Sequence, residues 1–153
     1  MTEELNGEFQ DLWDMPSFLF RVLENKSNAL FQNLTVGINL TTRQFGVLFI
    51  LAKYGSISQI ELSDRVSSDK STVGEMVARM VQRRLLTRTQ GEDKRAVMIS
   101  ITDEGRELVA QVSPLVSSIQ RTVLENLPEE YQPLFVKCLK ILAESNFESS
   151  PRQ

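Results

Sequence analysis

The sequence contains no histidine and only one cysteine, Cys138. Imidazole and thiolate are the groups that most often bind transition metals in proteins, so a metal site built by this chain is not expected. Serine and cysteine nucleophiles usually need a neighbouring imidazole to accept their proton, and that base is missing here. These absences exclude hydrolase triads and predict a protein that is not an enzyme and needs no cofactor.

Long apolar runs and cysteine pairs are missing as well. No uninterrupted apolar stretch approaches the roughly 18 residues that a membrane-spanning helix needs. A lone cysteine cannot form an internal disulfide, and residues 1–8 are acidic rather than a basic segment before an apolar run. We therefore expect a cytoplasmic protein with no membrane partner, and its 153 residues suit one domain.

The formal net charge of −3 conceals an uneven distribution of charge. Residues 65–95 carry eight basic and four acidic side chains, whereas residues 1–14 carry five acidic side chains and no basic one. A protein that binds nucleic acid concentrates positive charge where it meets the phosphates. The middle of the chain is therefore the expected site of nucleic-acid contact.

The first half of the chain carries helix signals. Thr41 with Gln44, and Ser58 with Glu61, have the spacing of a capping box, in which two side chains satisfy unpaired amides at a helix start. Apolar residues at helical spacing predict a long helix before them. The helices expected are 15–34, 42–54 and 59–66, with Gly37 stopping the first and Gly55 ending the second as a left-handed cap.

The second half begins with an amphipathic helix and a hairpin. The helix is expected to start near Lys70, after a polar turn. Its apolar stripe is Val73, Val77, Met80 and Val81. Extended and alternating patterns then predict strands over 85–90 and 96–101. Two further helices are expected, one over 103–125 and one that has Pro128 as its first helical residue and runs to about residue 146.

This order of elements is the plan of a winged helix-turn-helix protein, mainly α-helical with a small β-wing, whose second helix enters the major groove of DNA. Short polar side chains at the start of that helix let its backbone approach the bases, and arginines further along bind phosphates. A basic hairpin tip suits insertion into the minor groove. The candidate DNA-binding residues are Ser68, Lys70, Ser71, Thr72, Glu75, Arg79, Arg83, Asp93, Lys94 and Arg95.

Three segments of the sequence resemble the MarR family of transcriptional regulators. They are the stretch from Asp69-Lys70-Ser71-Thr72-Val73 through Arg84-Leu85-Leu86, then Asp93-Lys94-Arg95-Ala96 and Ser100-Ile101-Thr102-Asp103-Glu104-Gly105, and the likeness extends over nearly the whole chain. The resemblance implies a two-fold homodimer with intertwined terminal helices, and repression that a small molecule usually relieves. It also implies that Arg95 is a minor-groove arginine, oriented by Asp93.

The predicted helices themselves favour a dimer. The first helix and the last two carry apolar faces that the small DNA-reading helices cannot cover alone. A symmetric pair would place its two groove helices about one DNA turn, roughly 34 Å, apart on a near-palindromic operator. We therefore assign 39–102 to the DNA-binding domain and 1–38 with 103–153 to the dimerisation helices, within one continuous fold.

The segment from Trp13 to Arg21 resembles a branch of the family that controls the breakdown of aromatic acids, including hydroxycinnamates. Arg21 lies in an otherwise apolar turn, where its guanidinium could bind a ligand carboxylate while aromatic neighbours cover the ligand ring. Trp13, Ser17 and Asn28 are further candidates for this pocket. The alternative is a surface arginine whose charged head lies in water.

The expected function is therefore a ligand-responsive repressor of aromatic-acid catabolism genes, released from DNA by a small aromatic carboxylate. Two alternatives remain open. A winged-helix scaffold also serves for binding protein partners, which would suit the acidic isoelectric point of about 5.1. A regulator of this family could also respond to a redox or general phenolic effector, but Cys138, set among apolar residues, is expected to be a small core residue.

Overall fold

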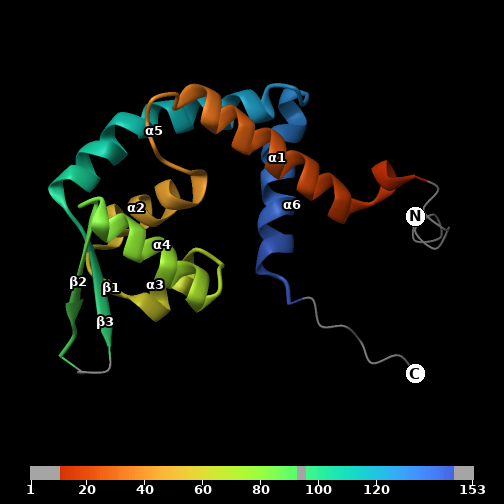
Figure 1. The fold of residues 1–153 in the computed structure, drawn as a ribbon. Coiled ribbons are helices and arrows are strands. Elements are labelled where there is room, and N and C mark those ends of the chain that lie inside the picture. Colours follow the sequence, from red (N-terminus) through yellow and green to blue (C-terminus); the bar gives the residue numbers. More distant parts are fainter. Residues whose placement is uncertain (1–10, 93–95, 147–153) are drawn as a thin grey trace, which may run out of the picture.

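The computed structural model of the chain, which describes residues 11–92 and 96–146, is built mainly of helices (Figure 1). In chain order the helices are η2 (Leu12–Asp14), α1 (Pro16–Leu34), α2 (Thr42–Tyr54), α3 (Gln59–Arg65), α4 (Lys70–Gln82), α5 (Asp103–Leu124), η3 (Glu129–Tyr131) and α6 (Gln132–Glu144), where η marks a 3-10 helix. The strands are β1 (Ile57–Ser58), β2 (Leu86–Gln90) and β3 (Val97–Ile101). This order confirms the predicted winged helix-turn-helix plan.

The sheet is antiparallel and three-stranded, in the order β1-β3-β2. Strands β2 and β3 form the predicted hairpin, in which Leu86 lies opposite Ile101. Strand β1, where Ile57 pairs with Ile99, was not predicted, because two residues are too few to show an alternating pattern. It joins the start of α3 to the wing.

The hydrophobic core lies where α2, α3 and α4 meet the base of the wing. Its fully buried members include Leu48, Leu51, Leu62, Val73, Val77, Met80 and Ile99. The predicted apolar stripe of α4 is confirmed, since three of its residues are buried and Val81 is half-buried. Each side chain of this kind contributes about 1.5–3 kcal/mol when fully buried, so the position of α4 is fixed by packing.

Helices α1 and α5 run alongside each other above this core (Figure 1). Helix α5 continues through Pro114 as one element. Buried residues on both helices, Phe31 on α1 with Val112 and Ile119 on α5, belong to the same hydrophobic cluster as the wing base. The DNA-binding elements and the long helices are therefore parts of one packed body.

The capping predictions hold in part. Thr41 and Gln44 form the complete box, with hydrogen bonds of 3.2 and 3.1 Å in the two directions. The Ser58 hydroxyl accepts from the Glu61 amide at 3.1 Å, but the Glu61 carboxylate accepts from Arg65 instead of turning back to the helix start. Only half of the second box is therefore formed.

The conformation of one cap and the start of one helix differ from the predicted ones. Gly55 has the expected positive φ of 81°, but its ψ of −140° lies in a region open essentially to glycine alone rather than in the left-handed helical region. Pro128, with φ −50° and ψ 141°, precedes the short η3 and is not the first residue of the last helix. Helix α6 starts at Gln132 because Pro133 has no N–H to bond the Glu129 carbonyl, which interrupts the α-helical ladder.

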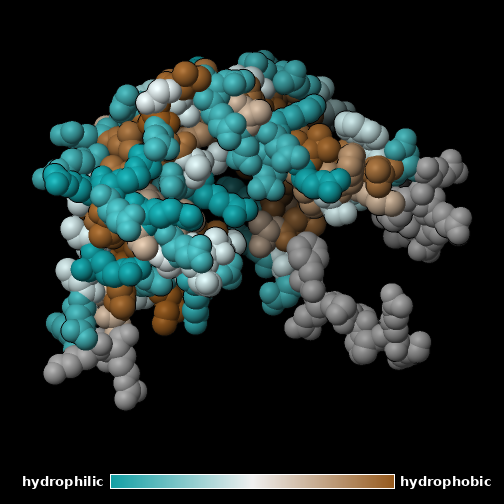
Figure 2. Space-filling model, in the orientation of Figure 1, coloured by the Kyte–Doolittle hydropathy of each residue, from teal (hydrophilic) through white to brown (hydrophobic). Residues whose placement is uncertain are grey.

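Helix α6 has no buried residue, and one of its faces is both apolar and open. Leu134 and Ile141 are each more than half exposed, and Cys138 lies between them on the same face. The prediction that Cys138 is a core residue is therefore wrong for the single chain, because the half-buried side of α6 is the opposite one, with Phe135 and Leu139. Apolar side chains also gather on the surface of α1 and α6 in Figure 2.

None of the helices in residues 11–92 and 96–146 has the length and apolar character that a membrane span requires.

Candidate nucleic-acid interface

A tight turn joins α3 to α4. Ser67 adopts a positive φ of 49°, which is unusual for a residue other than glycine. The Ser68 amide then donates to the carbonyl of Ser63 at 3.1 Å, so the turn is closed by a backbone hydrogen bond. This turn sets the angle at which α4 leaves α3.

Helix α4 begins with a side-chain cap. The Asp69 carboxylate accepts from the Thr72 amide at 2.8 Å and from the Thr72 hydroxyl at 2.6 Å. These two bonds, the hydroxyl first, hold the pKa of the Asp69 carboxyl below its ordinary value. The arrangement fixes the first turn of α4, and Thr72 already donates its hydroxyl within the protein.

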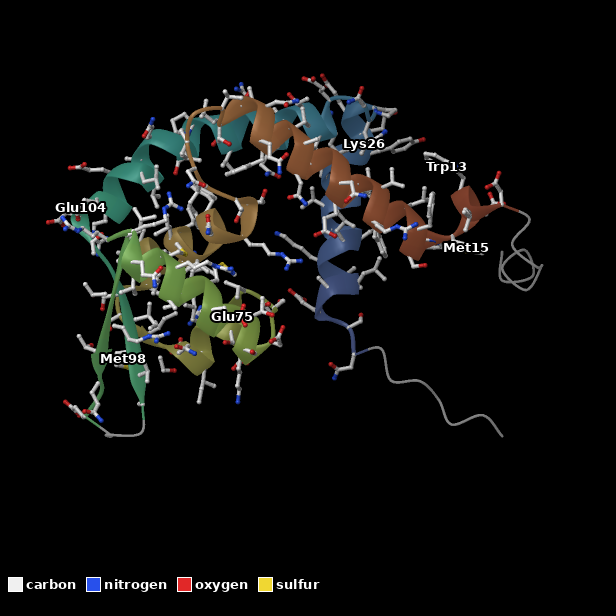
Figure 3. The ribbon with its side chains drawn as sticks, viewed as in Figure 1. Trp13, Met15, Lys26, Glu75, Met98 and Glu104 are labelled. Carbon is white, nitrogen blue, oxygen red and sulfur yellow. The ribbon has the colours of Figure 1, made fainter. Side chains whose placement is uncertain are left out.

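The outer face of α4 carries most of the predicted DNA-binding residues. Lys70, Ser71, Glu75 and Arg79 are exposed, whereas Thr72 and Arg83 are half-buried at the edge of the face. The side of α4 opposite to them is the buried apolar stripe. Figure 3 places Glu75 on α4 and Met98 on the wing at the same end of the molecule. The small polar start and basic continuation of α4 are thus presented together to solvent.

The predicted tip residues Asp93, Lys94 and Arg95 lie outside the described residues. The strands that carry the tip are described, and β2 packs beside α4. Ser68, the remaining predicted residue, is half-buried in the turn before α4. The roles of the tip residues in DNA binding stay predictions.

One polar contact between the wing and the helices was not predicted. The Arg88 guanidinium on β2 donates to Oε1 of Gln59 at 3.0 Å and approaches the carbonyl of Gly74 at 3.5 Å. In the sequence Arg88 counted only toward the local positive charge. Its partner Gln59 is 29 residues away, so no local pattern reports the contact.

A cleft of about 550 Å³ lies between α1, α2 and the turn before α4. Its lining includes Glu24 and Asn28 from α1, Arg43, Gly46 and Ile50 from α2, and Arg65, Ser67, Ser68 and Met76 from the helix-turn-helix. Nη2 of Arg43 lies 3.9 Å from Oε1 of Glu24, and both side chains are largely exposed. The cleft therefore combines apolar walls with two guanidinium groups, and it borders the turn that leads into α4.

Of the four predicted ligand-binding residues, only Asn28 lines this cleft. Trp13 packs edge-on against Phe18, with ring centroids 5.7 Å apart, and the Arg21 guanidinium lies 5.1 Å from the centre of the same ring. Ser17 is exposed nearby. These three residues gather at the start of α1, so the structure divides the predicted pocket into two places. Figure 3 shows Trp13 just before the start of α1, far from Glu75.

Sequence reasoning missed the cleft residues Glu24, Arg43 and Arg65. The cleft is lined by residues from elements that are distant in the sequence, so no local pattern reports it. The Arg65 guanidinium forms an ion pair with Glu61, with Nη2 2.9 Å from Oε1, and its Cζ lies 4.0 Å from the centroid of the Tyr54 ring. The hydrogen bond to Glu61 raises the pKa of Arg65. Because arginine is protonated in proteins in any case, a positive charge lies beside the cleft.

Comparisons with known proteins agree with this geometry. The sequence model of the MarR family matches residues 40–97, which include α2, α3, α4 and most of the wing. Transcriptional regulator HosA of Escherichia coli O157:H7 is 34% identical over 103 residues, which make up 67% of this chain and 76% of that protein.

Two solved structures share the whole fold. BpsR of Bordetella bronchiseptica, whose DNA binding is regulated by 6-hydroxynicotinic acid, has a TM-score of 0.85 and 25% identity, covering 92% of this chain and 100% of its own. The PcaV transcriptional regulator of Streptomyces coelicolor, in complex with its natural ligand, has a TM-score of 0.82 and 26% identity, covering 91% and 99%.

Proposed function

The chain belongs to the MarR family of transcriptional regulators, and from this premise we propose that it is a homodimeric repressor of aromatic-acid catabolism genes. Family members are DNA-binding regulators and not enzymes. The proposed repressor acts in the cytoplasm, binds a near-palindromic operator, and leaves it when a small aromatic carboxylate binds. The observation that carries the proposal is the exposed polar and basic face of α4 beside the wing.

The DNA-binding part rests on how α4 is mounted. Its buried stripe and the Asp69 cap hold the helix rigidly, while Ser71 and Arg79 remain exposed on the other face. A helix in the major groove needs small polar residues where its backbone approaches the bases, and basic residues where it meets phosphates. In the proposed complex Ser68, Lys70, Ser71, Thr72, Glu75, Arg79 and Arg83 line the major groove, and Arg95, oriented by Asp93 and flanked by Lys94, enters the minor groove.

The homodimer is supported by the apolar surface that a single chain leaves uncovered. The open face of α6, the short η2 and the first turns of α1 carry exposed large apolar side chains, namely Leu12, Trp13, Phe20, Leu23, Leu134, Ile141 and Leu142. Exposed apolar patches of this kind mark sites of association. In the proposed dimer the terminal helices of two chains cover one another and hold two copies of α4 toward one duplex.

The ligand-binding part rests on the cleft. Its volume of about 550 Å³ suits a small molecule. Arg43 offers a guanidinium to a carboxylate, since its 3.9 Å contact with Glu24 is long and exposed and therefore weak. The ligand ring would lie against Ile50 and Met76, with the Asn28 amide as a further polar partner. Because Ser67 and Ser68 line the same cleft, a bound ligand would contact the turn that orients α4 and could displace it.

DNA binding is tested with a duplex from the DNA that flanks the coding sequence. Fluorescence anisotropy of the labelled duplex should show nanomolar binding by the wild-type protein. Six to ten phosphate contacts should weaken binding by about 10³ to 10⁵ between 50 and 200 mM salt. Affinity for the duplex that does not change with salt concentration, or no binding at all, would contradict the proposed repressor function and favour a protein-interaction module.

The effector is tested by titrating benzoate, protocatechuate and hydroxycinnamates into the protein–DNA complex while following release of the duplex. Arg43→Ala should require at least tenfold more ligand for release, and Arg21→Ala should behave as the wild type. A loss confined to Arg21→Ala would place the ligand at the start of α1, as the sequence predicted. If no compound releases the wild-type protein, the aromatic-acid proposal is wrong and DNA binding still stands.

A further inference from the structure

Three elements meet at the side chain of Arg88. Its guanidinium hydrogen-bonds to Gln59, the first residue of α3, and approaches the backbone carbonyl of Gly74 in the second turn of α4. By the alternation of a strand, Arg88 points to the same side of the sheet as the buried Leu86. Arg88 is therefore the first polar residue of β2 on the inner face, directly opposite the buried Ile99 of β3.

Hydrophobic packing holds only the base of the wing. Leu86, Ile99 and Ile101 are buried, whereas every residue of β2 from Thr87 to Gln90 is exposed. Beyond Met98, which pairs with Ser58 of β1, the wing is a two-stranded ribbon, and such a ribbon is marginally stable in water. Polar contacts near its base therefore help to set its direction. The hydrogen bond from Arg88 to Gln59 is one such polar contact, and it lies at the level where the buried residues of the wing end.

The position of Gln59 depends in turn on Gly74. A Cβ atom at residue 74 would lie 3.2 Å from Nε2 of Gln59, so the absence of a side chain lets the amide rest against α4. The planar guanidinium of arginine has several donors in a fixed geometry, which allows it to bond one group while facing another. Arg88, Gln59 and Gly74 therefore form a small polar brace, which we call the wing brace.

We propose that Arg88 is a positioning residue, which through the wing brace holds the wing at a fixed angle to α4 without itself contacting DNA. This inference rests on the proposed DNA-binding function. The wing and α4 are expected to enter adjacent grooves of one duplex, so their relative angle decides whether both can bind at once. When the brace is broken, the wing pivots on its base and part of the contact with DNA is lost.

The test is a double-mutant cycle in DNA binding with Arg88→Ala, Gln59→Ala and the double variant. Each single substitution should weaken binding to the flanking duplex about tenfold, and the double variant should be no weaker, because either change breaks the same brace. The slope of log affinity against log salt should match the wild type in all three, whereas loss of a phosphate contact lowers it by about 1. Arg106→Ala, which removes an exposed charge on α5, is the control and should bind normally.

Circular dichroism melting of every variant shows whether the fold is kept, and Gln59→Ala carries the test if Arg88→Ala does not fold. Wild-type affinity in both single variants would overturn the wing brace and leave the repressor intact. A lower salt slope in Arg88→Ala, together with normal binding by Gln59→Ala, would show a direct phosphate contact and also overturn it. If the wild-type protein does not bind the duplex, the proposed DNA-binding function itself is refuted.

Discussion

The hydroxyl of Thr102 donates a hydrogen bond of 2.7 Å to the carbonyl oxygen of Arg84, across 18 residues that contain the whole hairpin. The same hydroxyl accepts from the Gly105 amide at 3.0 Å and so caps α5. Arg84 has a positive φ of 60°, a conformation that the closure of this ring stabilises. One oxygen atom therefore joins the base of the wing to the start of the long helix.

Gly105→Ala should destabilise the protein strongly. A Cβ atom there would meet the Leu85 carbonyl oxygen and would lie 2.7 Å from Cγ1 of Ile101, so α5 would have to move away from the wing. Overpacking of this kind costs about 1–3 kcal/mol and occasionally more. Urea unfolding should show a lower free energy of unfolding. An unchanged value would mean that α5 and the base of the wing can move apart at little cost.

Gly46→Ala is the matched control. Gly46 lies inside α2, and a Cβ atom there would meet nothing within 4 Å. Alanine is favoured over glycine in a helix interior by up to about 1 kcal/mol, so this variant should be more stable than the wild type. The two substitutions should therefore shift the urea midpoint in opposite directions.

Arg79→Ala should weaken DNA binding without changing the fold. Arg79 is exposed in the last turn of α4 on the predicted DNA face, and the free energy of unfolding should stay within about 0.5 kcal/mol of the wild type. If Arg79 neutralises a phosphate, the salt slope of binding should fall by about 1. Anisotropy titrations at several salt concentrations measure this, with Arg121→Ala on α5 as the control. An unchanged slope would remove Arg79 from the interface.

The Asp69 cap predicts a pH effect on stability. Because hydrogen bonds from Thr72 lower the pKa of the folded carboxyl, ionised Asp69 stabilises the protein above its unfolded pKa. That contribution is lost as the pH falls through the lowered pKa, that is, below about pH 4. Asp69→Asn keeps a good helix-capping side chain but cannot ionise. The wild type should be the more stable at neutral pH, and the difference should shrink in acid; a gap that is constant with pH would contradict this.

The open face of α6 predicts a dimer that charge can disrupt. Leu134→Glu combined with Ile141→Glu places two charges among exposed apolar side chains, and sedimentation should then report a monomer. Lys140→Glu, which changes charge on another side of α6, should remain dimeric. The monomer should also lose most of its affinity for DNA, since it presents a single copy of α4. A monomeric wild type, or a double variant that stays dimeric, would show that this face is not the interface.

The elements with local signals could be predicted from the sequence, and those that depend on distant contacts could not. The box of Thr41 and Gln44, and the apolar stripe of α4, are set by residues three or four positions apart, so they can be read directly. The start of α6 was misplaced because Pro128 also fits a first helical position, and the break that Pro133 causes in the helical ladder was overlooked.

The sites show the same division. The outer face of α4 follows from the position of its buried stripe, and the predicted residues on it are exposed or at its edge. The cleft and the wing brace bring together residues from separate elements, such as Arg88 and Gln59, which no sequence spacing connects. Cys138 was misjudged for a related reason, because an apolar helix face alone does not reveal whether its own chain or another covers it.

Ser67 and Ser68 belong at once to the wall of the cleft and to the turn before α4. If an occupant of the cleft weakens DNA binding through that turn, thermodynamic linkage requires DNA to weaken the occupant by the same factor. A promoter whose operator binds the protein tightly would then be released only at a higher effector concentration than a promoter whose operator binds it weakly. Through this shared turn, a single protein would switch on its target genes one after another as the effector accumulates.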